Sequence, residues 1–598
     1  MSIILDGTDG ITTPSVTYEG DATINGITVG KGAGAVATNV AVGVSALAAN
    51  TSGANNVAIG TNTLDANTSG TSNTGVGANS LDANTTGGSN SALGYLSLFA
   101  NTEGTNNSAI GRSALEQNTT GGTNTAVGAQ ALRANTTASY NTAVGYQAAY
   151  GTTIGSYNAS FGQAAFNSNT TGNYNTALGT QSLASNTEAS SNTAVGYRAG
   201  YSNTTGAGNT SVGRQSLYNT TTAQLLTGIG AYSAYSNLTG EGLVAIGYES
   251  LYSNTTGNSN IAIGGYSLYG SVPAALNANT TGSFNVAIGT GALKSNTEAS
   301  NNTAVGYKAG YAITTGFSNV FIGNNAGDSA TEATGSVFIG TLAGQSVTTG
   351  IANTLVGGSY GNYAGGSLTT GSLNTFIGTD AGGLMTTGSG NTIIGAYDGN
   401  EGGLDIRTAS NHIVLSDGAG NPRGYWDANG QAYFYGIGGS GATRFKVSSS
   451  AGTSFDLISG FHSASNITNG TTAFFITSNG NLYNTNNSYN GFSDAKLKEN
   501  IVDASSQWND IKALRVRKYN MIGDSVVQLG VVAQELESAG MSGLVTERAD
   551  RDANDNELDT TTKSVKYSVL YMKAVKALQE AMIRIEQLES DVATLKGN

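Results

Sequence analysis

Cysteine is absent from the 598 residues, proline occurs three times, and only 11% of the residues are charged. The lack of cysteine excludes a disulfide framework and any thiolate metal site. Proline is too scarce for a collagen-like helix, and charge is too low for an acidic disordered tail. Because glycine is abundant, at 86 residues, the composition predicts an ordered, repetitive architecture dominated by its backbone.

Further absences limit the partners. The net charge of −13 argues against nucleic acid, because phosphates are bound by clustered lysine and arginine. No stretch approaches the about 18 apolar residues of a membrane-spanning helix, and the start "MSIILDGTDGITTPSV" has no signal-peptide pattern, so we expect synthesis in a cytoplasm without membrane insertion. His412 and His462 are the only histidines and have no acidic cluster at ligand spacing, so neither metal nor cofactor is expected.

Residues 39–400 repeat the motif Asn-x-Ala-(Val/Ile/Leu)-Gly, which reads "NTAVG" at Asn124 and Asn141. Twenty-one such positions lie between 39 and 391, and eighteen of the twenty intervals share one 17-residue period. The two longer intervals, which begin at Asn260 and Asn353, indicate loops inserted around "GSVPAALN" and "GNYAGG". One unit cannot bury its apolar positions alone, whereas stacked units share a core. The repeat therefore predicts a parallel β-solenoid.

The unit "NTAVGAQALRANTTASY" indicates how a coil is built. A strand around Ala126 and Val127 alternates small and branched side chains, and Leu132 gives a second apolar anchor. Gly128 allows a sharp turn, and "ANTT" forms a polar one. Equivalent side chains would lie about 4.8 Å apart, so twenty intervals predict a shaft of about 100 Å. Charged columns would repel themselves at this spacing, whereas asparagine columns can hydrogen-bond up the stack.

Two surface features have alternative interpretations. The triplets "NTT", "NTS" and "NLT" match a glycosylation sequon but are also ordinary turn chemistry. Tyr146, Tyr197 and Tyr307 recur at one position of the unit. They could stack on sugars, although packing on neighbouring coils or protomers is favoured.

The 17-residue arrays of residues 39–400 resemble the head repeats of trimeric autotransporter adhesins, and still more the "NTAVGY" arrays of phage tail fibres. The resemblance implies a trimer of parallel β-rolls. Secreted adhesins also need a signal peptide and a C-terminal membrane-anchoring segment, and neither pattern is found here, which favours the phage family.

The segments that flank the shaft differ from it. Residues 1–38 hold two strand-like pieces, "SIILDG" and "ATINGITVG". They resemble the virion-proximal end of marine phage fibres, which implies attachment to the tail or baseplate, or they merely cap the solenoid. Residues 401–492 lose the repeat and gather aromatic residues, with hairpins predicted at "SDGAGN" and "SNGN". This segment is either a distal receptor-binding tip or a stalk that joins rod to tip.

Charge rises sharply at residue 493. Residues 1–400 carry 7 Lys+Arg and 16 Asp+Glu, whereas residues 493–598 carry 14 and 17, which marks a domain boundary. Helical periodicity around Trp508 is followed by a strand from Arg515 to Met521, and "VVQLGVVAQELESAG" predicts a strand and then a helix.

Residues 560–598 are expected to form one long amphipathic helix. Its apolar seam steps by 3, 4, 3, 3, 4 and 3 along the sequence, which is typical of a coiled coil with one interruption. This pattern predicts self-association through Val575, Leu578, Met582, Ile585, Leu588, Val592 and Leu595.

The boundary itself reads "GFSDAKLKENI". Ser493 and a nearby lysine could form a dyad, in which a neutral amine takes the hydroxyl proton and the alkoxide attacks a carbonyl. The lysine must be desolvated, because its unperturbed pKa is about 10.4. Spacing does not select between Lys496 and Lys498, and two surface lysines beside a helix N-cap serine are the alternative interpretation.

"SDAKLKENI", followed by "LGVVAQELE" and a coiled coil, resembles the autoproteolytic intramolecular chaperone that ends phage endosialidase tailspikes and many tail fibres. The family pattern Ser-Asp-x-x-Leu-Lys-x-Asn-Ile matches at every specified position. The resemblance implies that Ser493 is the nucleophile, Lys498 the general base and Phe492–Ser493 the scissile bond. It also implies that residues 493–598 hold three chains together during folding and then cut themselves off once, without activity on external substrates.

These patterns predict a mostly β fold: an elongated homotrimeric parallel β-solenoid fibre with a C-terminal α+β chaperone domain ending in a coiled-coil helix. The expected function is a structural phage tail fibre for host recognition and adsorption, located in the virion. It would be attached to tail or baseplate through its N-terminus and would reach a host surface glycan or protein through its distal region.

Two alternatives come from other classes. A polysaccharide-depolymerising tailspike would need paired carboxylates facing a groove, whereas the acidic residues of 39–400 are isolated along the sequence. A cellular adhesin or extracellular filament subunit is the other alternative.

Overall fold

A computed structural model describes residues 21–24, 26–267, 271–359, 361–434, 456–462, 471–477, 482–484, 499–520, 522, 527–551 and 557–597. The chain divides into two compact units, Met1–Arg444 and Phe445–Asn598.

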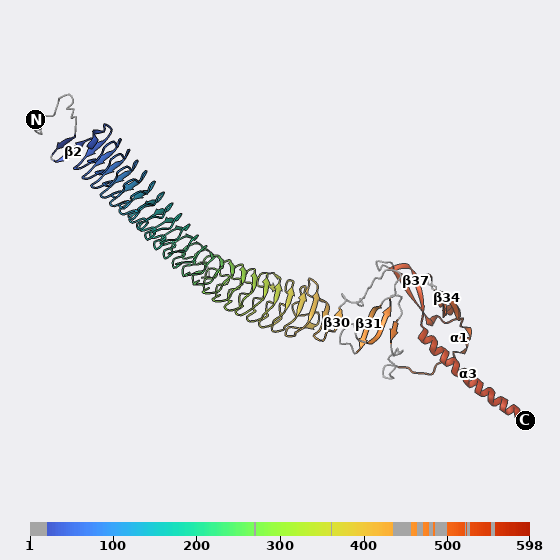
Figure 1. The fold of residues 1–598 in the computed structure, drawn as a ribbon. Helices are drawn as coiled ribbons and strands as arrows, with labels where there is room; N and C mark the ends of the chain where they lie inside the picture. Colours follow the sequence, from blue (N-terminus) through green and yellow to red (C-terminus); the bar gives the residue numbers. More distant parts are fainter. Residues whose placement is uncertain are drawn as a thin grey trace. The chain divides into compact units, whose positions relative to one another are not determined.

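Unit 1 is a parallel β-solenoid in which each coil contributes one short strand. Successive strands pair in parallel with a shift of one coil, as in Thr125↔Thr142 and Val127↔Val144. Twenty-two strands stack in this way in the described part of unit 1, and Figure 1 shows them side by side from blue to yellow. The solenoid predicted from the repeat is therefore confirmed. The strands are β3 (Val40–Val42), β4 (Val57–Ile59), β5 (Thr74–Val76), β6 (Ser91–Leu93), β7 (Ser108–Ile110), β8 (Thr125–Val127), β9 (Thr142–Val144), β10 (Ala159–Phe161), β11 (Thr176–Leu178), β12 (Thr193–Val195), β13 (Thr210–Val212), β14 (Thr227–Ile229), β15 (Val244–Ile246), β16 (Ile261–Ile263), β17 (Val286–Ile288), β18 (Thr303–Val305), β19 (Val320–Ile322), β20 (Val337–Ile339), β21 (Thr354–Val356), β24 (Thr375–Ile377), β25 (Thr392–Ile394) and β28 (Ile413–Ser416).

Antiparallel strands cover both ends of the stack. β1 (Ala22–Ile24) pairs with β2 (Ile27–Gly30), and β2 pairs with β3. At the other end β28 pairs with β29 (Pro422–Trp426), and β29 pairs with β30 (Ala432–Phe434). The hairpin predicted at "SDGAGN" is the β28–β29 connection, whereas the piece "SIILDG" lies outside the described residues. These strands occupy edges that would otherwise present unpaired backbone groups to other chains.

The two long repeat intervals contain inserted loops, as predicted. Ser267 and Val272 form an isolated bridge in the first. In the second, β22 (Gly358–Ser359) and β23 (Asn362–Tyr363) form a short hairpin.

A further hairpin precedes the last coil and consists of β26 (Asn400–Glu401) and β27 (Leu404–Asp405). The last coil begins at His412, whose amide donates to Asn391 Oδ1 at 2.9 Å. Asparagine side chains accept the same bond in most of the preceding coils, so the stack continues past residue 400.

The solenoid core is narrow and built mainly from small side chains. In the coil that begins at Asn124, the inward strand residue Ala126 and the anchor Leu132 are fully buried. Equivalent positions form columns, which gather into two buried clusters along the stack. Larger rings take the alanine position in later coils, as at Phe321 and Phe338.

Two columns of buried asparagine tie each coil to the next. Asn124 Nδ2 donates to Ala138 O at 2.8 Å, and Asn124 Oδ1 accepts the backbone N–H of Asn141 at 2.9 Å. In the second column Asn135 Nδ2 donates to Asn118 Oδ1 at 2.6 Å. Buried amides without partners are costly. These ladders give partners to most of the buried asparagine amide groups and confirm the predicted hydrogen bonding up the stack.

The fifth residue of each unit is glycine for two reasons. Gly128 has a φ of 133°, a region that side chains rarely adopt. A Cβ at Gly128 would also lie 2.4 Å from Gly145 O in the next coil. The predicted sharp turn is confirmed, and the close approach of successive coils is a second constraint on the same residue.

Side chains at equivalent positions of adjacent coils act on one another as the spacing predicts. Burial raises the pKa of Asp82, and its neighbour Asp65 in the preceding coil raises it further. Where signs alternate, Arg133 Nε lies 2.8 Å from Glu116 Oε2 and lowers the pKa of Glu116. Tyrosines of adjacent coils stack instead, with ring centroids 5.2 Å apart between neighbours along Tyr201, Tyr218, Tyr235 and Tyr252.

Unit 2 contains small antiparallel sheets and short helices followed by one long helix. The strand predicted from Arg515 to Met521 is confirmed as β34 (Arg517–Asn520). The strand and helix predicted after it are β35 (Val527–Gly530) and α2 (Ala533–Ser538). The predicted turn "SNGN" lies outside the described residues, but the strands on either side of it, β32 (Thr471–Thr477) and β33 (Leu482–Asn484), pair antiparallel. The long helix begins at Tyr567 rather than at residue 560, because residues 560–565 belong to β37, where threonine and valine favour a strand. The elements are β31 (Asp456–His462), β32 (Thr471–Thr477), β33 (Leu482–Asn484), α1 (Trp508–Ala513), β34 (Arg517–Asn520), β35 (Val527–Gly530), α2 (Ala533–Ser538), η3 (Ser542–Leu544), β36 (Val545–Arg551), β37 (Glu557–Val565) and α3 (Tyr567–Lys596).

We expect Gly128→Ala to destabilise the coils around it by about 1–3 kcal/mol, because alanine is strained at this φ and would meet Gly145 O. Hydrogen exchange at Val127 and Val144 should accelerate. Gly335→Ala is the matched control, because Gly335 is also left-handed but a Cβ there has nothing within 4 Å. Equal acceleration in both variants would show that coil-to-coil contact is not what requires glycine.

Candidate functional site

The last coils of unit 1 form a groove of about 360 Å³ beside hairpin β22–β23. We call it the acidic groove. Its side chains combine two carboxylates, amide and hydroxyl groups and one aromatic ring, a mixture that suits a hydroxyl-rich ligand. They are Gln345, Asn362, Tyr363, Ser367, Asp380 and Asp398, and Leu384 also lines the groove.

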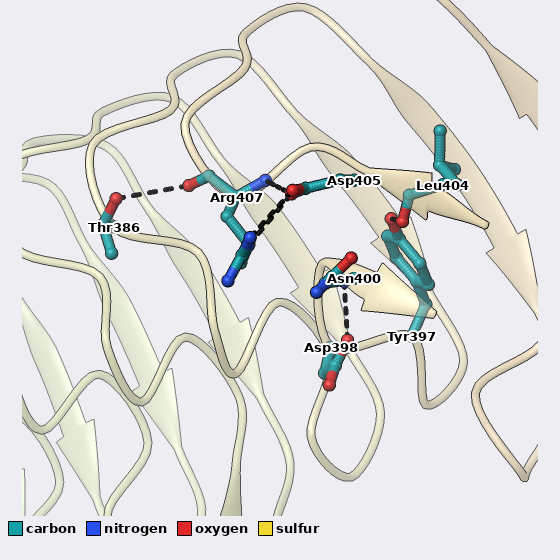
Figure 2. Close-up of polar contacts among 7 residues, drawn as sticks. All are labelled: Thr386, Tyr397, Asp398, Asn400, Leu404, Asp405 and Arg407. Atoms are coloured by element: carbon teal, nitrogen blue, oxygen red, sulfur yellow. Dashed lines mark hydrogen bonds and ion pairs between the residues drawn. The ribbon is translucent and has the colours of Figure 1, made fainter. Parts of the chain in front are cut away.

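The turn before hairpin β26–β27 holds Asp398 at the groove. Tyr397 is fully buried, and its hydroxyl donates to Leu404 O at 2.8 Å, which fixes the base of the hairpin. The amide of Asn400 donates to Asp398 Oδ1 at 2.7 Å. Figure 2 shows both bonds on the same loop, so the orientation of Asp398 follows from a buried anchor and a local backbone donor.

The groove is electrostatically unbalanced. Burial raises the pKa of the Asp380 carboxyl, and the nearby Asp398 raises it further. The pKa of Glu401 is raised in the same way, by burial and then by these two carboxylates. Arg407 pairs with Asp405 at 2.8 Å instead (Figure 2), and no ion pair in the described part of the protein includes Asp380 or Asp398.

The expectation that acidic residues of the shaft are isolated is therefore wrong for this pair. Asp380 and Asp398 belong to successive coils of the stack, and the pairing of those coils brings both to one groove. One feature of the sequence could have located the groove. The intervals from Asn353 to Asn374 and from Asn391 to His412 are both longer than the 17-residue period.

Ser493, Lys498 and the cleavage-site residue Phe492 lie outside the described residues, as does the alternative partner Lys496. The described part of the C-terminal domain begins at Glu499. The Ser-Lys dyad stays a prediction.

The segment that follows this cluster is docked on α3. Ser506 Oγ donates to Glu580 Oε2 at 2.6 Å, and the Gln507 amide donates to Glu580 Oε1 at 3.0 Å. The guanidinium of Arg584 lies 4.2 Å from the ring centroid of Trp508, within the range of a cation–π contact. α3 thus positions α1, the first helix after Ser493 in the described sequence.

A second group of contacts organises α2 and the hairpin β36–β37. Arg517 forms a bidentate pair with Glu535, with its closest contact at 2.6 Å. Lys563 Nζ lies 2.7 Å from Glu537 Oε2, and this contact raises the pKa of Lys563. This ion pair therefore favours the charged form of Lys563.

Residues 493–546 match the family model described as chaperone of endosialidase. These residues belong to an endosialidase-type chaperone domain. Together with the solenoid of 17-residue coils, this domain gives the protein the architecture of a tail fibre or tailspike that ends in such a chaperone. No curated protein and no solved structure matches the sequence.

The long helix of unit 2, α3, has an uncovered apolar seam. Along α3 the seven predicted seam residues are between 45% and 78% exposed, and they begin at Val575 and end at Leu595. Leu578 also lines an apolar groove of about 350 Å³ with Trp508 and Ile511 of α1. A helix that exposes a continuous apolar stripe is suited to association with a second helix.

The remaining residues that the sequence singled out are His412 and three tyrosines of the shaft. His412 Nδ1 lies 2.7 Å from Ser410 O, and its ring stacks on Tyr425. Tyr146, Tyr197 and Tyr307 are 40–48% exposed. The described residues contain no group of three potential metal ligands, and no described helix is long and apolar enough to cross a membrane.

We expect Leu588→Asp to weaken self-association of the protein, because it places a carboxylate in the seam of α3. Burial of one leucine is worth about 1.5–3 kcal/mol, so association should weaken at least tenfold per subunit. With Ser493→Ala in every sample, so that the chain stays at full length, light scattering would measure the mass against the 60.2 kDa of one subunit. Ser590→Asp adds the same charge at an exposed residue off the seam and should leave the mass unchanged. Unchanged mass in Leu588→Asp would contradict a role for the seam.

Proposed function

We propose that the protein is a structural phage tail fibre that assembles as a homotrimer and carries a self-cleaving C-terminal chaperone. One observation carries the proposal: an unbroken stack of twenty-two coils is followed in the same sequence by a segment that matches the chaperone of endosialidase. A rigid, nearly uncharged rod serves to span distance. The proposal places it in the virion, with the N-terminal end at the tail or baseplate and the distal region at a host surface glycan or protein.

The exposed seam of α3 supports self-association. A coiled coil raises the effective concentration of the attached shafts and sets their register. Strand edges and apolar faces that are uncovered during folding would otherwise aggregate.

The proposed cleavage lies between Phe492 and Ser493. In the proposed step the Ser493 hydroxyl gives its proton to the neutral amine of Lys498 and attacks the Phe492 carbonyl. The peptide C–N bond then breaks, the lysine returns the proton to the leaving amine, and water hydrolyses the ester left on the serine. We propose that cleavage depends on assembly of the three chains. The contacts of Ser506 and Trp508 with α3 support this dependence, because the helix that would self-associate also positions the segment that follows the dyad.

We expect wild-type protein to run on a denaturing gel as two fragments, near residues 1–492 and 493–598. Ser493→Ala should stay at full length, because it removes the nucleophile. Lys498→Ala and Lys496→Ala, compared in parallel, identify the base: only the variant that lacks the base stays uncut. Ser505→Ala is the control, since Ser505 is an exposed serine, and it should be cut normally. Equal cleavage of wild type and Ser493→Ala would remove the dyad assignment.

A second candidate function is contact with, or cleavage of, a host polysaccharide in the acidic groove. The observation that favours it is the pair Asp380 and Asp398, since glycoside hydrolysis uses two carboxyl groups, one of them with a raised pKa. Among the described residues neither carboxylate has a paired cation, which favours neutral or amino sugars over acidic ones.

We expect Asp380→Asn and Asp398→Asn each to lower adsorption to host cells, and to abolish reducing-sugar release if the groove hydrolyses. Loss of one charge-assisted hydrogen bond corresponds to about 1.5–3 kcal/mol, or a tenfold or greater loss of affinity. Asp405→Asn is the control, because Asp405 is exposed and paired with Arg407 outside the groove. Adsorption equal to wild type in both groove variants would exclude this function.

A further inference from the structure

One coil of the solenoid lacks the leucine that anchors its core. Counted from the motif asparagine, the ninth residue is leucine in most coils before residue 300, as at Leu183 and Leu217, whereas the coil between these two has Gly200. Both leucines are buried, and they line a cavity of about 10 Å³ together with Gly200. The core is therefore incompletely filled at this coil.

Glycine at the ninth position leaves no such gap where it recurs in later coils. A Cβ on Gly310 would lie 2.6 Å from Phe321 Cδ2, because the third residue of the next coil is a phenylalanine that fills the space. In the coil after Gly200 the equivalent residue is Ser211, which is too small to do so. Phenylalanine or leucine atoms would lie 2.5–2.8 Å from a Cβ on each of the other later glycines, Gly327, Gly344, Gly365 and Gly382.

An asparagine ladder is broken at the same height. Thr220 takes the place of an asparagine, and Asn203 Oδ1, which would accept a bond from that asparagine, is buried without a hydrogen-bond partner among the described residues. On the other side of Thr220, Asn237 Nδ2 reaches its hydroxyl only at 3.5 Å, which is long for a hydrogen bond. Asn192 Nδ2, in the same coil as Asn203, also has no partner in the described structure. One coil thus holds two unpaired buried amide groups, which lowers its stability.

The apolar core divides at this point, although the sheet does not. One buried cluster ends at Ala199 and the next begins at Leu217, whereas the strands on either side still pair, as in Thr193↔Thr210. The cavity is close to the about 10–15 Å³ that one water molecule needs. Water can therefore enter as soon as the two coils separate slightly.

Partly exposed side chains connect the coils across this gap. Arg198 Nε donates to Gln181 Oε1 of the preceding coil at 2.7 Å. The guanidinium of Arg198 also lies 5.3 Å from the ring centroid of Tyr201, which stacks on Tyr218 of the following coil at 5.2 Å. Such contacts can shift by rotation of side chains at the surface, so they hold the coils together without fixing their distance as a filled core would.

We propose that residues 192–225, the two coils around this cavity, form a joint at which the shaft opens locally and yields to bending while the coils on either side stay packed. Local opening is easiest where few buried contacts are lost, and here the core, one asparagine ladder and two amide groups are all deficient. A long shaft that yields at one height can bend without unfolding elsewhere. The joint needs neither the host contact nor the chaperone chemistry proposed above.

Hydrogen exchange of the full-length protein, followed by mass spectrometry, tests the joint. Amides of residues 193–216 should exchange about tenfold or more faster than those of residues 108–131, the same part of two coils with complete leucine anchors. Gly200→Leu should slow exchange in the joint, because leucine has the same left-handed φ at Leu183 and Leu217. The nearest atom to the new Cβ is Leu183 Cδ2 at 3.0 Å, the end of a flexible side chain.

Two further variants complete the test. Thr220→Asn restores a donor to Asn203 Oδ1 and should also slow exchange in the joint, and it decides the question if Gly200→Leu does not fold. Gly310→Leu is the matched control, since Phe321 already fills its space, and it should speed exchange in its own coil. Equal exchange of the two wild-type segments would overturn the joint. Exchange in the joint that neither Gly200→Leu nor Thr220→Asn slows, or that slows equally in the coil of Gly310→Leu, would overturn the assignment of opening to the core defect.

Discussion

The structure depends on one constraint: the backbone of each coil lies directly on the backbone of the next at the spacing of paired β-strands. Gly128 and Gly145 meet so closely that a single methyl group would not fit between them. At this distance each residue of a coil lies beside the residues at the equivalent position of the adjacent coils. The composition follows, because most columns are filled by residue types that tolerate a copy of themselves. Asparagine side chains hydrogen-bond to asparagine, tyrosine rings stack on tyrosine, and alanine fills the core. Charged residues are rare, and where two carboxylates occupy equivalent positions, as Asp65 and Asp82 do, the pKa of Asp82 is raised.

The same spacing has different consequences for folding within one chain and for alignment between chains. Within one subunit each strand pairs with the equivalent strand of the next repeat, so the contacts are local in sequence and the coil can propagate from its neighbours. Between the copies of the homotrimer that we propose, identical coils would offer no feature that distinguishes one register from the next. A shift by one coil would cost only the contacts at the two ends. A chaperone domain that aligns the copies from one end would supply the register that the shaft lacks, which gives the C-terminal domain a physical reason to accompany a repetitive rod.

The period of the repeat predicted most of unit 1, because spacing alone determines the solenoid and its columns. The inward position of Ala126 and the anchor at Leu132 were also predictable. The final coil was not, because His412 stands where most other coils have asparagine and an insertion makes the interval from Asn391 to His412 longer than the period. The strand at residues 560–565 was missed because helical periodicity was extended over threonines that favour β structure. The candidate sites were less predictable still. Asp380 and Asp398 are separated along the sequence, and only the pairing of successive coils places both at one groove. The docking of Trp508 under Arg584 joins α1 to α3 across the intervening sheets, which no local pattern indicates.

Electron cryomicroscopy of the full-length protein tests the central claim of stacked coils most directly. We expect a shaft segment with a regular axial repeat of about 4.8 Å over about 100 Å, with one solenoid coil per sequence repeat. A shaft without this axial repeat, or one much longer than about 100 Å for the same part of the sequence, would contradict it.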